Sequence, residues 1–231
     1  MHMGAMKSPG VYLVEKNAFP NSVVEVATAV PAFIGHTEKA VNGNKSLLNK
    51  PWGITSMAEF RAYFGDAPKP KFDITEGEGD STISLNGKHY IAKRTDSYTL
   101  YYNMLLFYAN GGGPCYIISV GDYTSDIEKD KLEKGIIPLV KEQEPTMVVI
   151  PEAITLTDAN SCYALQQAML KHCGYEMRNR FALLDVYGGY KDRKHSDGDV
   201  VNTFREAIGS EFLDFGAAYY PWINTSIVQE N

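Results

Sequence analysis

The chain has 231 residues and a formal net charge of -6, which is enough length for one substantial hydrophobic core. Its Lys and Arg residues are dispersed, which argues against a nonspecific nucleic-acid binder, because phosphate neutralisation needs clustered cations. No apolar run approaches the roughly 20 residues that a membrane helix requires, so we expect no membrane insertion.

A short β-prone segment lies near the amino terminus and consists of Val11, Tyr12, Leu13, Val14 and Glu15. Loop residues 16–22 separate it from the next extended stretch, and no neighbouring segment is an obvious pairing partner. A lone strand near a terminus either joins its own sheet edge or adds to the edge of another chain. We therefore divide the chain into residues 1–22, a tag remnant (MHMGA) followed by an extended arm, and an α/β core of residues 23–231.

The first part of the core combines extended and helical signals. Residues 23–34 are expected to be extended, with residues 32–34 as the first buried strand. Thr55 or Ser56 is expected to cap a helix that Gly65 ends. The apolar stripe of this helix contains Met57, Phe60 and Phe64, with Arg61 at the same spacing.

Residues 73–95 are expected to form a peripheral hairpin. Asn86-Gly87 separates the two β-prone runs 82–85 and 89–92. This dipeptide is a strong hairpin signal, because both turn positions need a positive φ.

A helix leading into a buried strand follows the hairpin. Tyr101, Met104, Leu105 and Tyr108 recur at helical spacing before a run of three glycines. The apolar, non-alternating residues 115–120 then predict a strand that is buried on both faces.

The remaining chain repeats this alternation of helix and strand. A charged helix is expected over residues 126–140, broken or ended near Pro138, and a capped helix is expected from Thr157 or Asp158 to Gly174. Its stripe contains Cys162, Leu165, Met169 and Cys173, and a last helix is expected over residues 199–208. Strands are expected at residues 147–150, 181–186 and 217–223. This order predicts an α/β fold with a mainly parallel sheet flanked by helices on both faces.

Three carboxylates offer an enzymatic hypothesis. Asp122, Glu152 and Asp185 each follow a predicted strand or lie at its end, where ligands of parallel sheets usually bind. Together they could hold Mg²⁺ for phosphoryl transfer, although capping of turns and helices is the simpler interpretation. No phosphate-binding glycine loop accompanies them.

Nucleophilic catalysis has weaker support. The turn around Ser56 resembles the serine turn of subtilisin-like proteases, but His36 lacks the flanking pattern of a catalytic base. His172 and Cys173 are adjacent on a predicted helix and would point about 100° apart. Cys115, Cys162 and Cys173 have no zinc-binding spacing, and we expect them to be buried apolar residues in a protein made in a reducing compartment.

Six stretches, in register along nearly the whole chain, resemble the sheath protein of contractile phage tails and related contractile injection particles. They are residues 8–15 (SPGVYLVE), 30–37 (VPAFIGHT), 54–65, 110–116, 172–185 and 217–222 (AAYYPW).

The resemblance implies a structural subunit with no catalytic activity and no cofactor. It would polymerise helically with copies of itself around an inner tube protein, with baseplate and terminator proteins at the ends, and contract to drive the tube through an envelope. The arm residues 11–15 would be the strand shared between subunits. In that family the α/β core is called subtilisin-like for its topology alone, which accounts for the serine turn.

The sequence departs from the family pattern at its carboxyl end. Sheath proteins normally continue past the AAYYPW strand into a further domain, and this sequence ends at Asn231. We therefore expect this chain alone to be a monomer or a weak oligomer. The family resemblance implies synthesis in the cytoplasm followed by assembly into a phage tail or a similar particle.

Overall fold

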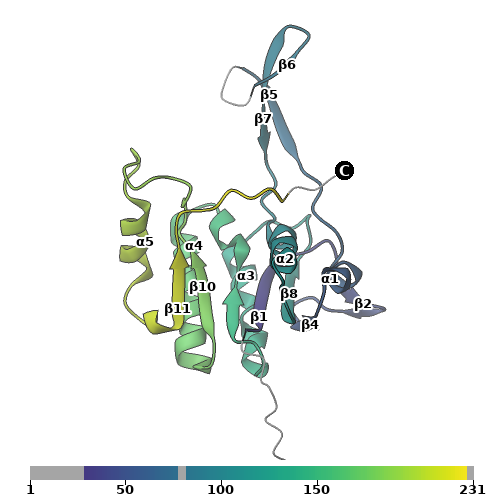
Figure 1. Ribbon diagram of the computed structural model, residues 1–231, viewed down its shortest axis with the longest axis vertical. Coiled ribbons are helices and arrows are strands. Elements are labelled where there is room, and N and C mark those ends of the chain that lie inside the picture. Colours follow the sequence, from purple (N-terminus) through teal and green to yellow (C-terminus); the bar gives the residue numbers. More distant parts are fainter. Residues whose placement is uncertain (1–28, 78–81, 228–231) are drawn as a thin grey trace, which may run out of the picture.

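The computed structural model describes residues 29–77 and 82–227 (Figure 1). The predicted arm, with Val11, Tyr12, Leu13, Val14 and Glu15, lies outside these residues. Within them a large central sheet is packed between helices, and a small sheet projects from the top of the molecule in Figure 1.

The central sheet has six strands in the order β11-β10-β9-β1-β8-β4. All neighbouring pairs are parallel except β4 and β8, which are antiparallel. The mainly parallel α/β fold is thus confirmed. The strands are β1 (Pro31–His36), β4 (Trp52–Ile54), β8 (Cys115–Gly121), β9 (Met147–Val149), β10 (Phe181–Asp185) and β11 (Gly216–Tyr219).

The central strands are buried on both faces, which explains their continuous apolar character. Within β1, Ile34 packs into one core cluster and Phe33 into the other. In β8, Ile118 packs into the first cluster and Ile117 into the second, and neither has any exposed surface. Successive side chains of a strand point to opposite faces, so such a strand needs apolar residues at every position.

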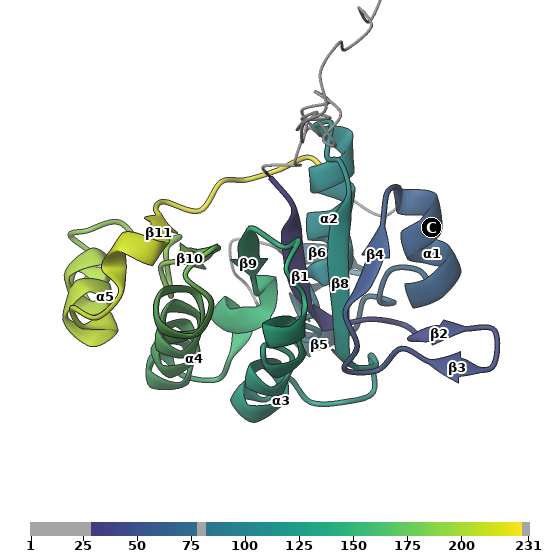
Figure 2. The same ribbon diagram turned by 90° about the horizontal axis from the view of Figure 1, so that it is seen from below.

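Helices cover both faces of this sheet (Figure 2). One face carries α3 (Lys129–Lys134), α4 (Ala159–Lys171) and α5 (Val200–Ile208), whose buried residues join the first core cluster. The other carries α1 (Met57–Phe64) and α2 (Leu100–Ala109), which supply buried Phe60, Phe64 and Met104 to the second.

The predicted caps are confirmed where the sequence signal was strong. Ser56 accepts a hydrogen bond from the Glu59 amide at the start of α1, and Asp158 accepts one from the Ser161 amide at the start of α4. These side-chain oxygens satisfy amides that have no partner within the helix. Asp199 caps α5 in the same manner.

The predicted hairpin is part of a three-stranded antiparallel sheet, which we call the projecting sheet. Its order is β5-β7-β6, with β5 (Phe72–Glu76), β6 (Thr82–Leu85) and β7 (Lys88–Arg94). Asn86 and Gly87 have φ values of 52° and 76°, as the turn signal predicted. The sequence analysis did not predict β5, because acidic residues obscure the alternation of Phe72 and Ile74.

Three element boundaries were wrong. The helix expected over residues 126–140 is limited to α3, and Pro138 lies in a separate 3-10 helix, η1 (Ile137–Lys141). Beyond α4, the chain continues as a π-helix, η3 (His172–Met177), instead of stopping at Gly174. A Cβ atom on Gly174 would lie 2.6 Å from the Phe212 Cβ, so this glycine permits close packing. The last strand ends at Tyr219, four residues earlier than expected.

The remaining elements are short. They are the strand pair β2 (Val41–Asn42) and β3 (Lys45–Ser46) and the 3-10 helices η2 (Pro151–Thr155) and η4 (Leu213–Phe215). Among the described residues, no helix has the length and apolar character needed to cross a membrane.

Candidate functional site

The strand order creates a topological switch point at the carboxyl edge of the central sheet. The next parallel strand along the chain after β1 is β8, which lies on one side of β1. The parallel strand after that, β9, lies on the other side of β1. The five parallel strands thus have the doubly wound order 2-1-3-4-5, in which ligands bind between the first and third strands. Here that position lies between β1 and β9, where His36 and Glu152 are found.

The three predicted metal ligands do not converge at this edge. Asp122 follows β8 and Asp185 ends β10, and these strands are three strand spacings apart, roughly 14 Å. In residues 29–77 and 82–227, no group of three or more His, Cys, Asp or Glu side chains could hold a metal ion. The hypothesis of a Mg²⁺ site built from Asp122, Glu152 and Asp185 therefore receives no support.

Asp122 organises the turn after β8. Its Oδ1 accepts hydrogen bonds from the Thr124 amide at 2.9 Å, the Thr124 hydroxyl at 2.6 Å and the Ser125 hydroxyl at 3.2 Å. These bonds favour the charged carboxylate and lower its pKa. The simpler interpretation of this residue, a turn cap, is confirmed.

Glu152 is completely buried against His36. Its Oε2 accepts from the His36 backbone amide at 3.0 Å and lies 2.7 Å from His36 Nδ1, and neither side chain has exposed surface. Within the described chain, Glu152 Oε1 and His36 Nε2 have no hydrogen-bond partner. A Cβ atom on Gly121 would lie 2.8 Å from His36 Cδ2, so the backbone at Gly121 packs directly against the His36 ring. This pair joins β1 to the start of η2 across the switch point.

Asp185 is partly buried at the end of β10, and this burial raises its pKa. Its backbone carbonyl accepts a hydrogen bond from Gln166 Nε2 at 2.7 Å, which links β10 to α4. Asp185 therefore belongs to the packing of α4 on the sheet.

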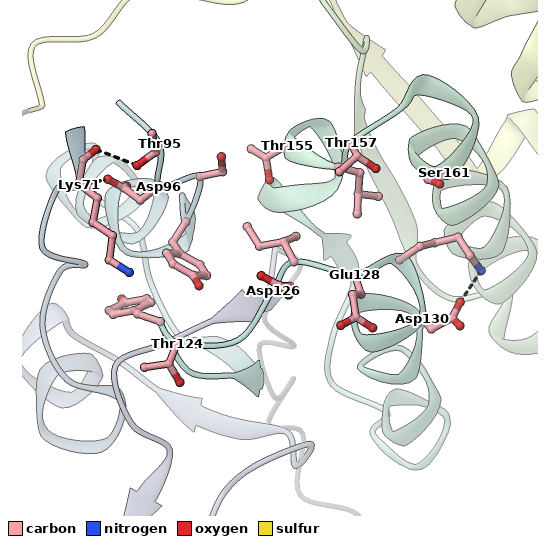
Figure 3. A pocket seen from close by; sticks show the side chains of 16 residues that line it. Lys71, Thr95, Asp96, Thr124, Asp126, Glu128, Asp130, Thr155, Thr157 and Ser161 are labelled. Atoms are coloured by element: carbon pink, nitrogen blue, oxygen red, sulfur yellow. Dashed lines mark hydrogen bonds and ion pairs between the residues drawn. The ribbon is translucent and has the colours of Figure 1, made fainter. Parts of the chain in front are cut away.

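Beside the switch point a cavity of about 830 Å³ opens to solvent (Figure 3). It lies between the segment before α2, the loop after β8 and the start of α4. Three of its four acidic side chains are engaged: Asp130 pairs with Lys129 at 3.0 Å, Glu128 pairs with Lys131 at 2.8 Å, and Asp96 accepts from the Lys71 amide. Since these groups hold the surrounding loops together, we assign no chemistry to the cavity.

The residues considered for nucleophilic catalysis have structural roles. Ser56 caps α1, as described above. Burial raises the pKa of Cys173 to about 12, so its thiol is protonated at neutral pH, and burial raises the pKa of Cys162 to about 12 as well. Cys115, Cys162 and Cys173 are all buried and free, as the sequence predicted.

His172, the first residue of the π-helix η3, belongs to a second buried polar network. Its Nδ1 lies 3.0 Å from Glu176 Oε2, and its Nε2 lies 3.3 Å from Arg180 Nη1, which also donates to the Leu139 carbonyl at 2.9 Å. Because Arg180 can only donate, Nε2 must accept, so the ring is neutral. Burial lowers the pKa of His172, in agreement with a neutral ring. Through Arg180, these hydrogen bonds connect η3 to η1.

The sequence analysis missed the exposed apolar side chains of the projecting sheet. Phe72, Ile74, Ile83 and Leu85 are between 53% and 66% exposed. The alternation within β6 was a usable signal for one apolar face, but nothing in the sequence indicated that this face is uncovered.

No family model and no curated protein matches this sequence. Among solved structures, a chain in the cryo-EM structure of the anti-feeding prophage (AFP) baseplate in its contracted state matches with a TM-score of 0.60 and 20% identity. A chain of the AFP helical sheath in its contracted state has a TM-score of 0.49 and 22% identity. The matches cover 97% and 94% of this chain but 50% and 46% of those chains, so it spans about half of their length. The baseplate match shows a shared fold over nearly all of the chain.

Proposed function

We propose that this protein is a structural subunit of a contractile sheath, which polymerises helically around an inner tube and contracts to drive that tube through a target envelope. The observation that carries the proposal is the shared fold with a chain of the contracted AFP baseplate over 97% of this sequence. The six sheath-like sequence motifs support it independently, because they follow the same order along the chain.

Several of these motifs coincide with elements that define the fold. The VPAFIGHT motif contains β1 at the centre of the sheet, and the AAYYPW motif contains the end of β11 at its edge. In this proposal the folded core moves as a rigid body during contraction, while extended arms hold neighbouring subunits together. Backbone pairing between an arm and a neighbour tolerates rotation of the cores when a flexible loop joins arm and core.

Val11, Tyr12, Leu13, Val14 and Glu15 are the arm strand in this proposal, and residues 16–22 are the linker. The partners are copies of the same protein, an inner tube protein, and baseplate and terminator proteins. The protein then acts without catalysis, as part of a phage tail or a phage-tail-like particle.

The test is co-expression with an inner tube protein and baseplate proteins of a contractile particle, followed by electron microscopy. We expect hollow striated cylinders that contain this protein, and we expect deletion of residues 1–22 to abolish them. Particles that form without this protein would overturn the proposed function. Cylinders that persist after the deletion would overturn the role of the arm while leaving the sheath assignment intact.

A further inference from the structure

Two segments at opposite ends of the central sheet carry opposite charge. Residues 39–50, which we call the basic flap, contain three lysines and no acidic residue. Residues 206–214, which we call the acidic segment, contain two glutamates, one aspartate and no basic residue. The net charge of the whole chain is -6, so the basic flap is opposite in sign to the protein that carries it.

The strand order separates the two segments. The basic flap lies beyond the β4 edge of the sheet, where its strand pair β2 and β3 protrudes beside α1 (Figure 1, Figure 2). Gly43, with a φ of 56°, lies in the turn between these two strands. The acidic segment lies beyond the β11 edge and contains the end of α5 and the start of η4. One end of the molecule therefore presents a basic protrusion and the other an acidic surface.

The charged side chains of both segments are exposed. They are Lys39, Lys45 and Lys50 on the basic flap and Glu206, Glu211 and Asp214 on the acidic segment. Within residues 29–77 and 82–227, none of the six forms an ion pair, and their one side-chain hydrogen bond runs from Lys50 Nζ to the Ser46 carbonyl at 2.9 Å. The protein's own fold leaves these charges available to a partner.

A groove of about 540 Å³ adjoins the acidic segment. Its walls are α4 and residues 208–212, so the acidic segment forms one of its sides. Glu211 lines the groove, and Lys171 lines it as well. The apolar part of the lining consists of Ala164, Ala168, Leu170, Ile208 and Phe212.

We infer that the basic flap of one copy of this chain docks against the acidic segment and the adjoining groove of a second copy. A second copy is the occupant because the chain itself supplies the complementary surface, which is a protruding strand pair of opposite charge at its other end. The inference rests on the proposed function in one respect, which is that assembly brings many copies together.

This contact joins two different surfaces and needs no two-fold axis. Each copy that docks its basic flap leaves its own groove free for a further copy. Heterologous contacts of this kind continue from copy to copy and generate rings or open helices. The geometry is therefore compatible with a helical assembly.

Exposed apolar side chains add to the contact. Val41 and Leu48 on the basic flap are 39% and 45% exposed, and Leu213 beside the acidic segment is 49% exposed. Exposed ion pairs are individually weak, and salt screens them beyond roughly 10 Å at an ionic strength of about 0.1 M. We therefore expect a weak, salt-sensitive contact between two copies, which gains strength where many copies assemble.

Cysteine cross-linking between two copies tests the geometry. The native cysteines are at most 1% exposed, so an introduced surface cysteine is the reactive thiol. One copy carries Asn44→Cys in the turn of the basic flap, and a second copy with a larger tag carries Ser210→Cys at the groove. With a short bismaleimide at low salt, we expect the mixed product to form about tenfold faster than either product of two like copies, a preference of about 1.4 kcal/mol.

A matched control replaces the groove cysteine with Ser84→Cys on the projecting sheet, which should react with the Asn44→Cys copy only at the slow rate of like copies. Equal rates for the mixed, like and control products would overturn the inference. Raising the ionic strength to about 0.5 M should lower the rate of the mixed product several-fold, because the charges are then screened. A rate that does not depend on salt would contradict recognition by charge.

Charge reversal tests the recognition directly. The flap-reversed copy carries Lys39→Glu, Lys45→Glu and Lys50→Glu, and the segment-reversed copy carries Glu206→Lys, Glu211→Lys and Asp214→Lys. Either reversal alone should lower the mixed cross-linking rate to that of the control, because like charges then meet. A flap-reversed Asn44→Cys copy together with a segment-reversed Ser210→Cys copy should restore the rate. Rates that neither reversal lowers, or that the combination fails to restore, would overturn the inference.

Lys171 gives a prediction of opposite sign. It lines the groove together with Glu211, so its charge opposes the entry of the basic flap. In the Ser210→Cys copy, Lys171→Glu should raise the mixed cross-linking rate several-fold. Lys194→Glu, at an exposed position that does not line the groove, should leave it unchanged. A lower rate for Lys171→Glu would contradict docking in this groove.

The outcomes separate this inference from the proposed function. Selective, salt-sensitive cross-linking together with a failure to form cylinders would remove the sheath assignment and retain the contact. Cylinders together with unselective cross-linking would remove the contact alone.

Discussion

The central sheet and the projecting sheet of this protein differ in what covers their apolar residues. Both faces of the central sheet are packed against helices, and side chains such as Ile34 and Ile118 have no exposed surface. The projecting sheet exposes Phe72 and Ile74, and no helix in the described part of the chain packs against either of its faces (Figure 1). We therefore expect the central sheet to contribute most of the folding stability and the projecting sheet to contribute little, because its apolar side chains remain exposed.

Two phenylalanine substitutions test this division most strongly. Phe60 is fully buried in the second core cluster, and Phe72 is 53% exposed on the projecting sheet. We expect Phe60→Ala to lower the free energy of unfolding by about 3 to 5 kcal/mol, because it leaves a cavity, and Phe72→Ala to change it by no more than about 0.5 kcal/mol. Urea titrations at low protein concentration measure both values. A large effect of Phe72→Ala would mean that the projecting sheet is packed against the core in solution.

Two glutamates extend the comparison to polar groups. We expect Glu152→Ala to cost about 3 kcal/mol, because it leaves the buried His36 amide and ring without their acceptor. Glu76→Ala breaks an exposed ion pair with Lys88 and should cost less than about 1 kcal/mol. The same urea titrations compare them, and similar costs would show that the His36–Glu152 pair contributes little to joining β1 and η2.

The smallest expected effect lies in the turn of the projecting sheet. Gly87 has a φ of 76°, a conformation that costs an alanine about 1 kcal/mol. Gly87→Ala should therefore speed hydrogen exchange of β6 and β7 amides several-fold and leave the exchange of β1 and β8 unchanged. Faster exchange throughout the chain would indicate that the two sheets unfold as one cooperative unit.

Much of the fold was predictable from local signals. The glycines after α2, the Asp158 cap and the Asn86-Gly87 turn each act within a few residues, so the sequence locates them directly. Errors occurred where packing overrode local preference. Gly174 predicted a helix end, but the π-helix η3 continues past it, and the missing Cβ of this glycine allows Phe212 to pack closely there.

The candidate site was only partly predictable. The sequence correctly put Asp122, Glu152 and Asp185 after or at the end of their strands, but their separation depends on the strand order. Glu152 instead meets His36, which is 116 residues away in the chain. Neither residue has a local pattern that could identify the other as its partner.

By itself the sequence determined the α/β class, most helices and strands, and the presence of a hairpin, because periodicity, caps and turns are local properties. The strand order, the His36–Glu152 pair and the uncovered face of the projecting sheet were decided only by the tertiary structure. An alternating pattern states that one face of a strand is apolar, but whether anything packs against that face depends on where distant parts of the chain lie.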